Sequence, residues 1–253
     1  MRRLAPIGLL TVVLPLAASA SAAAQSAPDT RPPRLAAKLE SCTKGALRSE
    51  RAVTFVGSMP AVPGAERMRM RFELERRRPG ERRWRRMRGV PGFGMWERSA
   101  PMRAGFIFHK RVDGLAVPAR YRAVVRFRWE SRDGRLVHSA RRRTATCAQP
   151  DLRPDLVPGA LAGAPEPRAG SALYTLVVRN GGRSAAGPFS VRVGPSTVEL
   201  DGLPAGEQRA VLVSGPVCAP GTTVLVEVDA DRRIEESRER GNASPRPCPL
   251  ADG

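Results

Sequence analysis

The chain has 253 residues and a formal net charge of +19, with 43 lysines and arginines against 24 aspartates and glutamates. After the first 24 residues, no segment approaches the roughly 18 consecutive apolar residues that a membrane span needs, so we expect no membrane-spanning helix. Charge divides the rest of the chain: residues 25–150 carry 30 positive and 11 negative side chains, whereas residues 151–253 carry 11 and 13.

The N-terminus has the pattern of a secretory signal peptide. It reads MRRLAPIGLLTVVLPLAASASAAAQ, with two arginines, a short apolar run and small residues up to Ala24. Such segments are removed during export. We therefore expect residues 1–24 to be a signal peptide, and the mature protein to be secreted into the extracellular space or the cell envelope.

Alternation of apolar and charged residues predicts strands in the basic region. In RMRMRFELE (67–75) and YRAVVRFRW (121–129) every second residue is apolar and most of the others are charged, with Val124 out of pattern. This period of two is typical of half-buried strands. Further strands are predicted at 52–56, 105–110 and 135–141, with a turn at RRPGER and a return strand near Trp84. No stretch shows a sustained helical period.

The segment from Arg76 to Arg88 has eight arginines in thirteen residues. Guanidinium groups bind phosphates, sulfates and carboxylates, and neighbouring aromatic rings add stacking surface. The candidate anion-binding residues are Arg76, Arg77, Arg78, Arg82, Arg83, Trp84, Arg85, Arg86 and Arg88. An anionic wall polymer, an acidic glycan or an extracellular nucleic acid would each fit this chemistry.

Composition offers another explanation of the same cluster. Forty of the 43 basic residues are arginine, a skew that a GC-rich genome would also produce. Trp84 and Trp96 could equally be core residues, because this region has few other large side chains.

A domain boundary is predicted at the proline-rich AQPDLRPDLVPG (148–159), where the charge also changes. This gives a basic β-sandwich of unknown family at 25–150 and a second domain at 151–253. Two cysteines fall in each domain. The expected disulfides are Cys42–Cys147 and Cys218–Cys248, because exported chains form structural bridges and no C-x-x-C redox pair is present.

The second region repeats the β pattern. Its predicted strands are ALYTLVVRN, FSVRVG, TVELDG, RAVLVSG and TTVLVEVDA, separated by Gly, Pro and Asn turns. Short strands at this spacing in about 100 residues are typical of an immunoglobulin-like sandwich. The predicted fold class is therefore all-β, with two immunoglobulin-like β-sandwich domains in tandem after the signal peptide.

Several motifs in this region occur in an order that resembles the CARDB family, a bacterial cell-adhesion-related module with an immunoglobulin-like fold. They are VVRNGGRSAAGPFSVRV (177–193), LDGLPAGEQRAVLV (200–213) and VEVDADRRIEESRERGN (226–242). The residues that fit the family pattern are Asn180, Gly182, Ala186, Gly187, Pro188, Phe189, Leu203, Ala205, Gly206, Glu207, Asp229, Ile234, Glu236, Glu239 and Asn242. The resemblance implies a role in adhesion.

The sequence departs from the family pattern in two places. The pair Cys218 and Cys248 is an addition. The strand that the family has after Asn242 is replaced by the proline-rich ASPRPCPLADG.

The acidic segment 226–242 raises the question of a cation site. Asp229-Ala-Asp231 resembles the start of a calcium loop, but Ile234 stands where an EF-hand has glycine and Arg240 where it has glutamate. The structural interpretation is preferred: the aspartates end a strand in a turn, Ile234 fills the core, and Glu235, Glu236 and Glu239 lie among arginines. No metal or other cofactor is predicted.

No catalytic constellation is recognised, because His109 and His138 lie in strand-like stretches without a nucleophile motif. We expect a secreted, non-enzymatic binding or adhesion protein at or near the bacterial cell surface, with an extracellular polymer or protein as partner. Two alternatives stay open: polyanion binding through the arginine-rich first domain, and a secreted hydrolase with an unrecognised active site in that domain.

Overall fold

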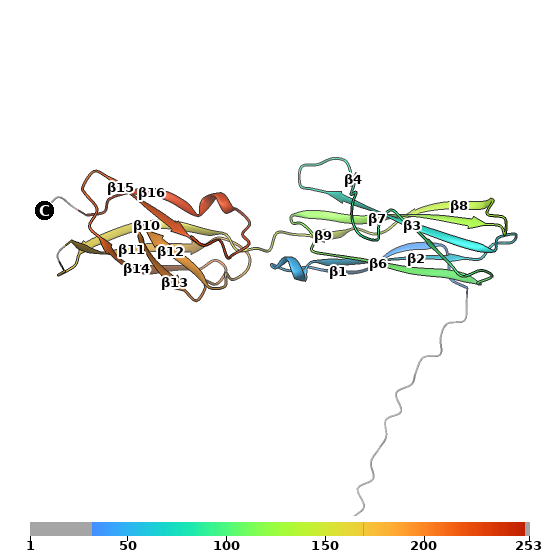
Figure 1. Ribbon diagram of the computed structural model, residues 1–253, viewed down its shortest axis with the longest axis horizontal. Coiled ribbons are helices and arrows are strands. Elements are labelled where there is room, and N and C mark those ends of the chain that lie inside the picture. The colour runs from blue at the N-terminus through green and yellow to red at the C-terminus, as the bar shows by residue number, and fades with distance from the viewer. Residues whose placement is uncertain (1–31, 169, 251–253) are drawn as a thin grey trace, which may run out of the picture. The chain divides into compact units, whose positions relative to one another are not determined.

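The computed structural model describes residues 32–168 and 170–250. This part of the chain consists almost entirely of antiparallel β-strands, with two short 3-10 helices (Figure 1). The prediction of an all-β chain with little helix is confirmed. The predicted signal peptide, residues 1–24, lies outside the described residues.

The N-terminal region, residues 32–149, forms two sheets. One has the strand order β1-β2-β6, and the other has the order β4-β3-β7-β8, with β5 also paired to β3 and β9 to β7. Figure 1 shows these two sheets as stacked layers. The elements are β1 (Ala36–Thr43), η1 (Arg48–Glu50), β2 (Ala52–Pro60), β3 (Arg67–Arg77), β4 (Arg85–Arg86), β5 (Trp96–Arg98), β6 (Gly105–Asp113), β7 (Ala119–Glu130), β8 (Leu136–Arg143) and β9 (Cys147–Gln149).

The predicted alternation in the two central strands is confirmed. β3 and β7 pair along their whole length, with Met70 opposite Phe127 and Phe72 opposite Val125. Their apolar residues point inward into one core shared by both sheets, and their arginines point outward. The largest buried ring is Trp129, whose indole N–H donates to the Pro60 carbonyl at 2.7 Å.

Three details of this region differ from expectation. The predicted return strand near Trp84 is reduced to β4, two residues long, while the turn before it has Gly80 at φ 78°. β1 and the three-residue strands β5 and β9 were not predicted, because none of them carries a clean period of two. Val124 is fully buried although it lies on the outward side of β7, which means that this side is itself covered.

The C-terminal region also forms two sheets around one core. Their strand orders are β10-β11-β14 and β13-β12-β15-β16. The elements are β10 (Leu156–Pro165), β11 (Ser171–Asn180), β12 (Phe189–Val193), β13 (Ser196–Leu200), β14 (Gln208–Pro216), β15 (Thr223–Val228), η2 (Glu239–Gly241) and β16 (Ala243–Pro247). The five predicted strands are present, and β10 and β16 are additional.

β16 corrects the expectation for the C-terminal segment. The proline-rich sequence after Asn242 does form a strand, paired antiparallel with β15. The Asn242 carbonyl accepts from Val228 N–H, and Cys248 N–H donates to the Thr222 carbonyl. The backbone N–H and C=O groups of the even-numbered residues of β16 therefore point toward β15. The backbone nitrogens of Pro245 and Pro247 therefore point away from β15, so their missing N–H groups remove no hydrogen bond between the two strands.

Both predicted disulfides are present. Cys42 in β1 is bonded to Cys147 in β9, and Cys218 is bonded to Cys248. Each bridge packs against the core of its own region. The predicted fold class, two sandwiches of antiparallel sheets, is confirmed, while the domain boundary near residue 150 remains a prediction.

Candidate functional site

The outer face of the larger N-terminal sheet is dominated by arginine. Outward residues of β3 and β7 stand directly opposite one another in register, and three of these pairs are arginine against arginine: Arg69 with Arg128, Arg71 with Arg126, and Arg77 with Arg120. Like charges directly opposed across strands are destabilising. Neighbouring groups must therefore offset the repulsion for this face to persist.

A buried glutamate balances the middle of this face. Glu73 is only 5% exposed, and its Oε1 lies 2.6 Å from Arg71 Nη2, 3.1 Å from Arg126 Nε and 3.4 Å from Arg86 Nη1. Burial acts to raise the pKa of Glu73, but the Arg86 and Arg126 guanidiniums outweigh it and hold the pKa below its ordinary value. One carboxylate thus neutralises part of the charge of three arginines.

Two further carboxylates on the face bind one arginine each. Glu75 pairs with Arg122 and Glu130 pairs with Arg69, both at 2.7 Å. Charge balance is therefore local: some arginines have a carboxylate within reach and others do not.

The two tryptophans of the predicted cluster region lie over arginines and outside the main core. Arg122 and Arg77 lie 4.1 and 5.0 Å from the centroid of the Trp84 ring. Arg128 and Arg71 lie 4.6 and 5.1 Å from that of Trp96. Such cation–π contacts stabilise a guanidinium without removing its charge. The segment between β3 and β6 therefore covers part of the outer face, which accounts for the burial around Val124.

The nine candidate anion-binding residues do not form one free patch. Four are exposed and have no ion-pair partner among residues 32–168 and 170–250: Arg78, Arg82, Arg83 and Arg88. Arg85 pairs with Glu81, Arg86 with Glu73, and Arg77 stacks with Trp84. Arg76 stands opposite Tyr121 in register and so belongs to the opposite face from Arg77.

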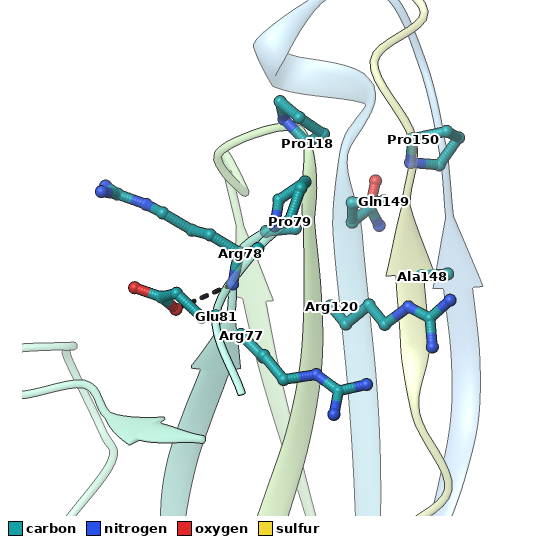
Figure 2. A pocket seen from close by; sticks show the side chains of 11 residues that line it. Arg77, Arg78, Pro79, Glu81, Pro118, Arg120, Ala148, Gln149 and Pro150 are labelled. Atoms are coloured by element: carbon teal, nitrogen blue, oxygen red, sulfur yellow. Dashed lines mark hydrogen bonds between the residues drawn. The ribbon is translucent and has the colours of Figure 1, made fainter. Parts of the chain in front are cut away.

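A cavity of about 460 Å³ lies beside the turn that follows β3, between the end of β3, the start of β7 and β9 (Figure 2). Arg77 and Arg120 extend along the same side of it. Figure 2 shows that Arg78 and the Glu81 carboxylate point away from these two guanidiniums. Glu81 Oε2 accepts from the Arg78 N–H at 2.9 Å.

Gln149 forms part of the wall of this cavity. It is 2% exposed, and its Nε2 donates to the Thr43 carbonyl at 2.7 Å. Its Oε1 has no hydrogen-bond partner within the described part of the chain. The bridge between Cys42 and Cys147 lies next to the amide, with Cys147 Sγ at 3.3 Å, and fixes β9 against β1.

The acidic corner of the C-terminal region is held together by internal bonds. Asp229, at φ 53°, accepts from the N–H of Arg233 at 3.0 Å and of Ile234 at 3.1 Å. Asp231 accepts from the Ser190 hydroxyl at 2.8 Å, and Ile234 packs on the core. Within residues 32–168 and 170–250, no group of three or more His, Cys, Asp or Glu side chains is placed to hold a metal ion.

Glu236 corrects the expectation that it lies among surface arginines. It is 1% exposed and accepts from the Leu156 N–H and from the Asn242 amide. Burial raises its pKa to about 7, against the opposing effect of these two bonds. By contrast, Glu235 is near Arg51 and Arg153, at 3.2 and 3.4 Å.

Asn180 is the other buried polar group of this corner. Its Nδ2 donates to the carbonyls of Ser184 and Leu203, both at 2.9 Å. Its Oδ1 accepts from Asp155 N–H at 3.1 Å and Gly182 N–H at 3.0 Å. A Cβ at Gly182 would lie 2.5 Å from the Arg153 carbonyl oxygen, so packing requires glycine at the second of the two positions after Asn180.

The two histidines make contacts of another kind. His109 Nδ1 lies 2.9 Å from Glu40, and the His138 ring lies 5.1 Å from the Trp129 ring. Neither contact includes a serine, threonine or cysteine nucleophile.

Sequence reasoning missed Arg120 and Gln149. Arg120 lies 43 positions after Arg77 and is brought beside it only by strand pairing. The one available signal for Gln149 is its position two residues after Cys147, which places both on the same side of a strand.

Comparisons with known proteins identify part of the chain. Residues 153–246 match the family model CARDB, and no match was found among curated proteins. Within the described residues, no helix is long and apolar enough to cross a membrane.

Two solved structures are similar at low identity. One is described as "Chaperone-tip adhesin complex is vital for synergistic activation of CFA/I fimbriae biogenesis", with 12% identity, a TM-score of 0.25, and coverage of 85% of this chain and 100% of that chain. The other is "Crystal Structure of Class 5 Fimbriae Chaperone CfaA", with 11% identity, a TM-score of 0.26, and coverage of 84% and 98%. Both TM-scores are below 0.5, so neither similarity supports an inference.

The family assignment agrees with the contacts of the motif residues. Phe189 and Leu203 are buried in the core, Asn180 and Glu236 bind backbone groups of other segments, and Asp229 closes the turn after β15. Residues 153–246 therefore match the CARDB family model in sequence, and the contacts of the motif residues agree with that match.

Proposed function

We propose that the protein is a secreted, non-catalytic binding protein that acts in adhesion at or near the bacterial cell surface. The observation that carries this proposal is the match of residues 153–246 to the CARDB family model. Two disulfides support an oxidising location outside the cytoplasm. The partner is an extracellular polymer or protein.

The test is retention of the mature protein, residues 25–253, on bacterial cells and isolated cell envelopes at physiological salt. The control is an unrelated secreted protein of similar isoelectric point, because a chain of pI 11.5 adheres weakly to many anionic surfaces. We expect retention well above that of the control. Retention equal to the control would contradict a specific surface role.

The non-catalytic part of the proposal has its own test. Incubation of the mature protein with panels of ester, glycoside and peptide substrates should give no turnover above that of a heat-denatured sample. Turnover that survives repeated purification would favour the secreted hydrolase instead.

A second candidate function is polyanion binding by the N-terminal region. The observation that favours it is the set of exposed arginines without a carboxylate partner in the described chain, Arg78, Arg82, Arg83 and Arg88, next to the arginine face of β3 and β7. Exposed guanidiniums bind anionic polymers and release counterions, so this affinity should fall steeply as salt increases.

Charge-matched variants test where such binding occurs. The triple substitution of Arg82, Arg83 and Arg88 by glutamine removes three exposed charges from the predicted cluster. The control replaces Arg103, Arg132 and Arg135, which are also exposed. We expect affinity for a polyanion such as heparin to fall at least about tenfold more in the first variant. Equal losses would mean diffuse attraction without a dedicated surface.

A further inference from the structure

We propose that the cavity between β3, β7 and β9 is a binding subsite for one acidic sugar unit of a polysaccharide. Arg77 and Arg120 bind the sugar carboxylate, and Gln149 accepts a hydrogen bond from a sugar hydroxyl. This inference rests on the proposed polyanion binding, for which it gives a ligand class and a place.

The first argument is the charge of the cavity. Arg77 and Arg120 stand directly opposite each other on β3 and β7, and neither has an ion-pair partner within residues 32–168 and 170–250. The neighbouring pair Arg71 and Arg126 shares the carboxylate of Glu73. A bound carboxylate would neutralise part of the charge of Arg77 and Arg120, as Glu73 does for Arg71 and Arg126. Two guanidinium forks suit the planar, two-oxygen geometry of that group.

The only carboxylate that lines the cavity does not fill this place. Glu81 accepts from the Arg78 N–H and pairs with Arg85 at 3.3 Å. In Figure 2 its oxygens are turned away from Arg77 and Arg120. The space beside these two guanidiniums is thus open to an anion from outside.

The second argument is the unpaired acceptor. Donation by Gln149 Nε2 to the Thr43 carbonyl fixes the orientation of the amide, because the reverse orientation would set two oxygens against each other. Oε1 is thus a buried acceptor to which no group among residues 32–168 and 170–250 donates, and such acceptors are rare in folded proteins. An ionised carboxylate, sulfate or phosphate has no proton to donate, whereas a sugar hydroxyl has one. A small outward movement of the wall is needed for contact, because Oε1 is covered in the free protein.

The remaining walls suit the non-polar faces of a sugar ring. Pro79, Pro118 and Pro150 lie around the cavity, together with Ala119 and Ala148 (Figure 2). The volume of about 460 Å³ is within the range of small-ligand pockets. Apolar walls with a few polar groups are the usual composition of such pockets.

The same features disfavour a single-stranded nucleic acid. Proteins bind such strands by stacking bases on open aromatic faces, and no aromatic side chain lines this cavity. The nearest tryptophan of the turn, Trp84, has the guanidiniums of Arg77 and Arg122 over its ring. An acidic polysaccharide is therefore the occupant that the contacts favour.

The experiment measures binding of a galacturonic acid oligomer to the mature protein by calorimetry, at physiological salt. Arg120→Gln should weaken binding about tenfold, since a hydrogen bond to a charged group is lost. Arg120→Lys keeps the charge without the fork and should recover only part of the affinity. Arg132→Gln is the matched control, because it removes one exposed charge outside both the cavity lining and the predicted arginine cluster, and should change affinity less than twofold.

Ligand variants test the chemistry of the occupant. The methyl ester of the oligomer lacks the charge, and poly-L-glutamate has carboxylates without hydroxyls, so both should bind at least about tenfold more weakly. A second readout is tryptophan fluorescence, because an anion on Arg77 changes the surroundings of Trp84. Circular dichroism melting of each variant verifies that the fold is retained.

Four outcomes would overturn the subsite. If Arg120→Gln and Arg132→Gln bind the oligomer with equal affinity, the cavity is not the binding site, even if heparin still binds and the polyanion function stands. If the protein binds poly-L-glutamate as tightly as the galacturonic acid oligomer, the site does not recognise the sugar. Tighter binding of DNA that is lost in Arg120→Gln makes nucleic acid the occupant. If the unaltered protein binds no polyanion at all, the proposed polyanion function fails with the subsite.

Discussion

The two β regions stabilise their polar groups in opposite ways. In the N-terminal region, charges lie on the outer face of a sheet, where Glu73 pairs with three arginines, and Trp84 and Trp96 each lie against two. In the C-terminal region, single side chains such as Asn180 and Glu236 are buried and bind several backbone groups or amides. We therefore expect the loss of one arginine to cost the first arrangement less than the loss of Asn180 or Glu236 costs the second.

The largest expected effect comes from the disulfides. In the chain-entropy model, a bridge that closes a longer loop stabilises more. Cys42–Cys147 spans 105 residues and Cys218–Cys248 spans 30. Replacing the first pair by serine should lower the free energy of unfolding by about 5 kcal/mol, and replacing the second by about 4 kcal/mol.

Urea denaturation of the two double variants measures this difference. Tryptophan emission reports on the N-terminal region alone, because Trp84, Trp96 and Trp129 all lie there. A loss of tryptophan-reported stability in the Cys218→Ser, Cys248→Ser variant as large as in the other would show that the two regions unfold as one unit.

The next largest loss of stability is expected from substitution of Asn180. Asn180→Ala leaves two carbonyls and two N–H groups without their partner in a buried place, and we expect a loss of about 3 kcal/mol. Hydrogen exchange of the β11 and β14 amides measures it. As a control, Arg179→Ala changes the exposed neighbour, and should leave exchange nearly unchanged. Similar exchange in the two variants would refute the importance of the buried network.

A pH titration sharpens the comparison because the two regions should respond with opposite sign. The pKa of Glu236 is about 7, above its ordinary value of 4.5. The folded protein therefore binds more protons than the unfolded one between these values. The stability of the C-terminal region should fall by on the order of 2 kcal/mol as pH rises from about 4.5 to 7.

Hydrogen exchange at several pH values, corrected for the intrinsic rate, gives this profile. Glu236→Gln removes the titrating group and should flatten the profile over the same range. An unchanged slope in that variant would assign the pH dependence to another group.

Glu73 should give the reverse response in the N-terminal region. Its pKa is lowered, so its contribution to stability is present above its ordinary value of 4.5 and is lost as pH falls through the folded-state pKa. Glu73→Gln should cost about 1–2 kcal/mol at neutral pH, because three guanidiniums lose a shared anion. Urea denaturation followed by tryptophan emission at pH 7 and pH 3 measures it. A variant that keeps the full acid sensitivity would show that Glu73 does not cause it.

The smallest effect is expected at exposed arginines. Arg82→Gln should change stability by less than about 0.5 kcal/mol, because the side chain is exposed and has no ion-pair partner in the part of the chain that the structure describes. The melting temperature measures this. A clear gain in stability would indicate repulsion within the cluster, which ligand binding would then relieve.

The strands were predictable where one face is buried and the other charged. β3 and β7 show a period of two because Met70 and Phe127 point into the core while Arg71 and Arg128 point outward. β9 could not be predicted, because three residues are too few to show a period, and its place depends on the bond from Cys147 to Cys42.

The candidate site was predictable only in part. The arginine cluster marks the right sheet, yet which arginines have partners depends on glutamates and tryptophans that strand pairing brings in from elsewhere. Glu236 looked like one surface charge among many, because neither its neighbours nor its spacing shows that Leu156, eighty positions earlier, lies against it. Long-range contacts of this kind follow from topology and leave no local pattern.

The prolines of β16 affect whether two copies of the chain can pair edge to edge. A strand at the edge of a sheet exposes a row of unpaired N–H and C=O groups that another chain can extend into a continuous intermolecular sheet. On the outward side of β16, Pro245 and Pro247 have no N–H to offer, and Ala243 alone retains one. We therefore expect the proline-rich sequence that departs from the family pattern to reduce edge-to-edge pairing between copies of this chain.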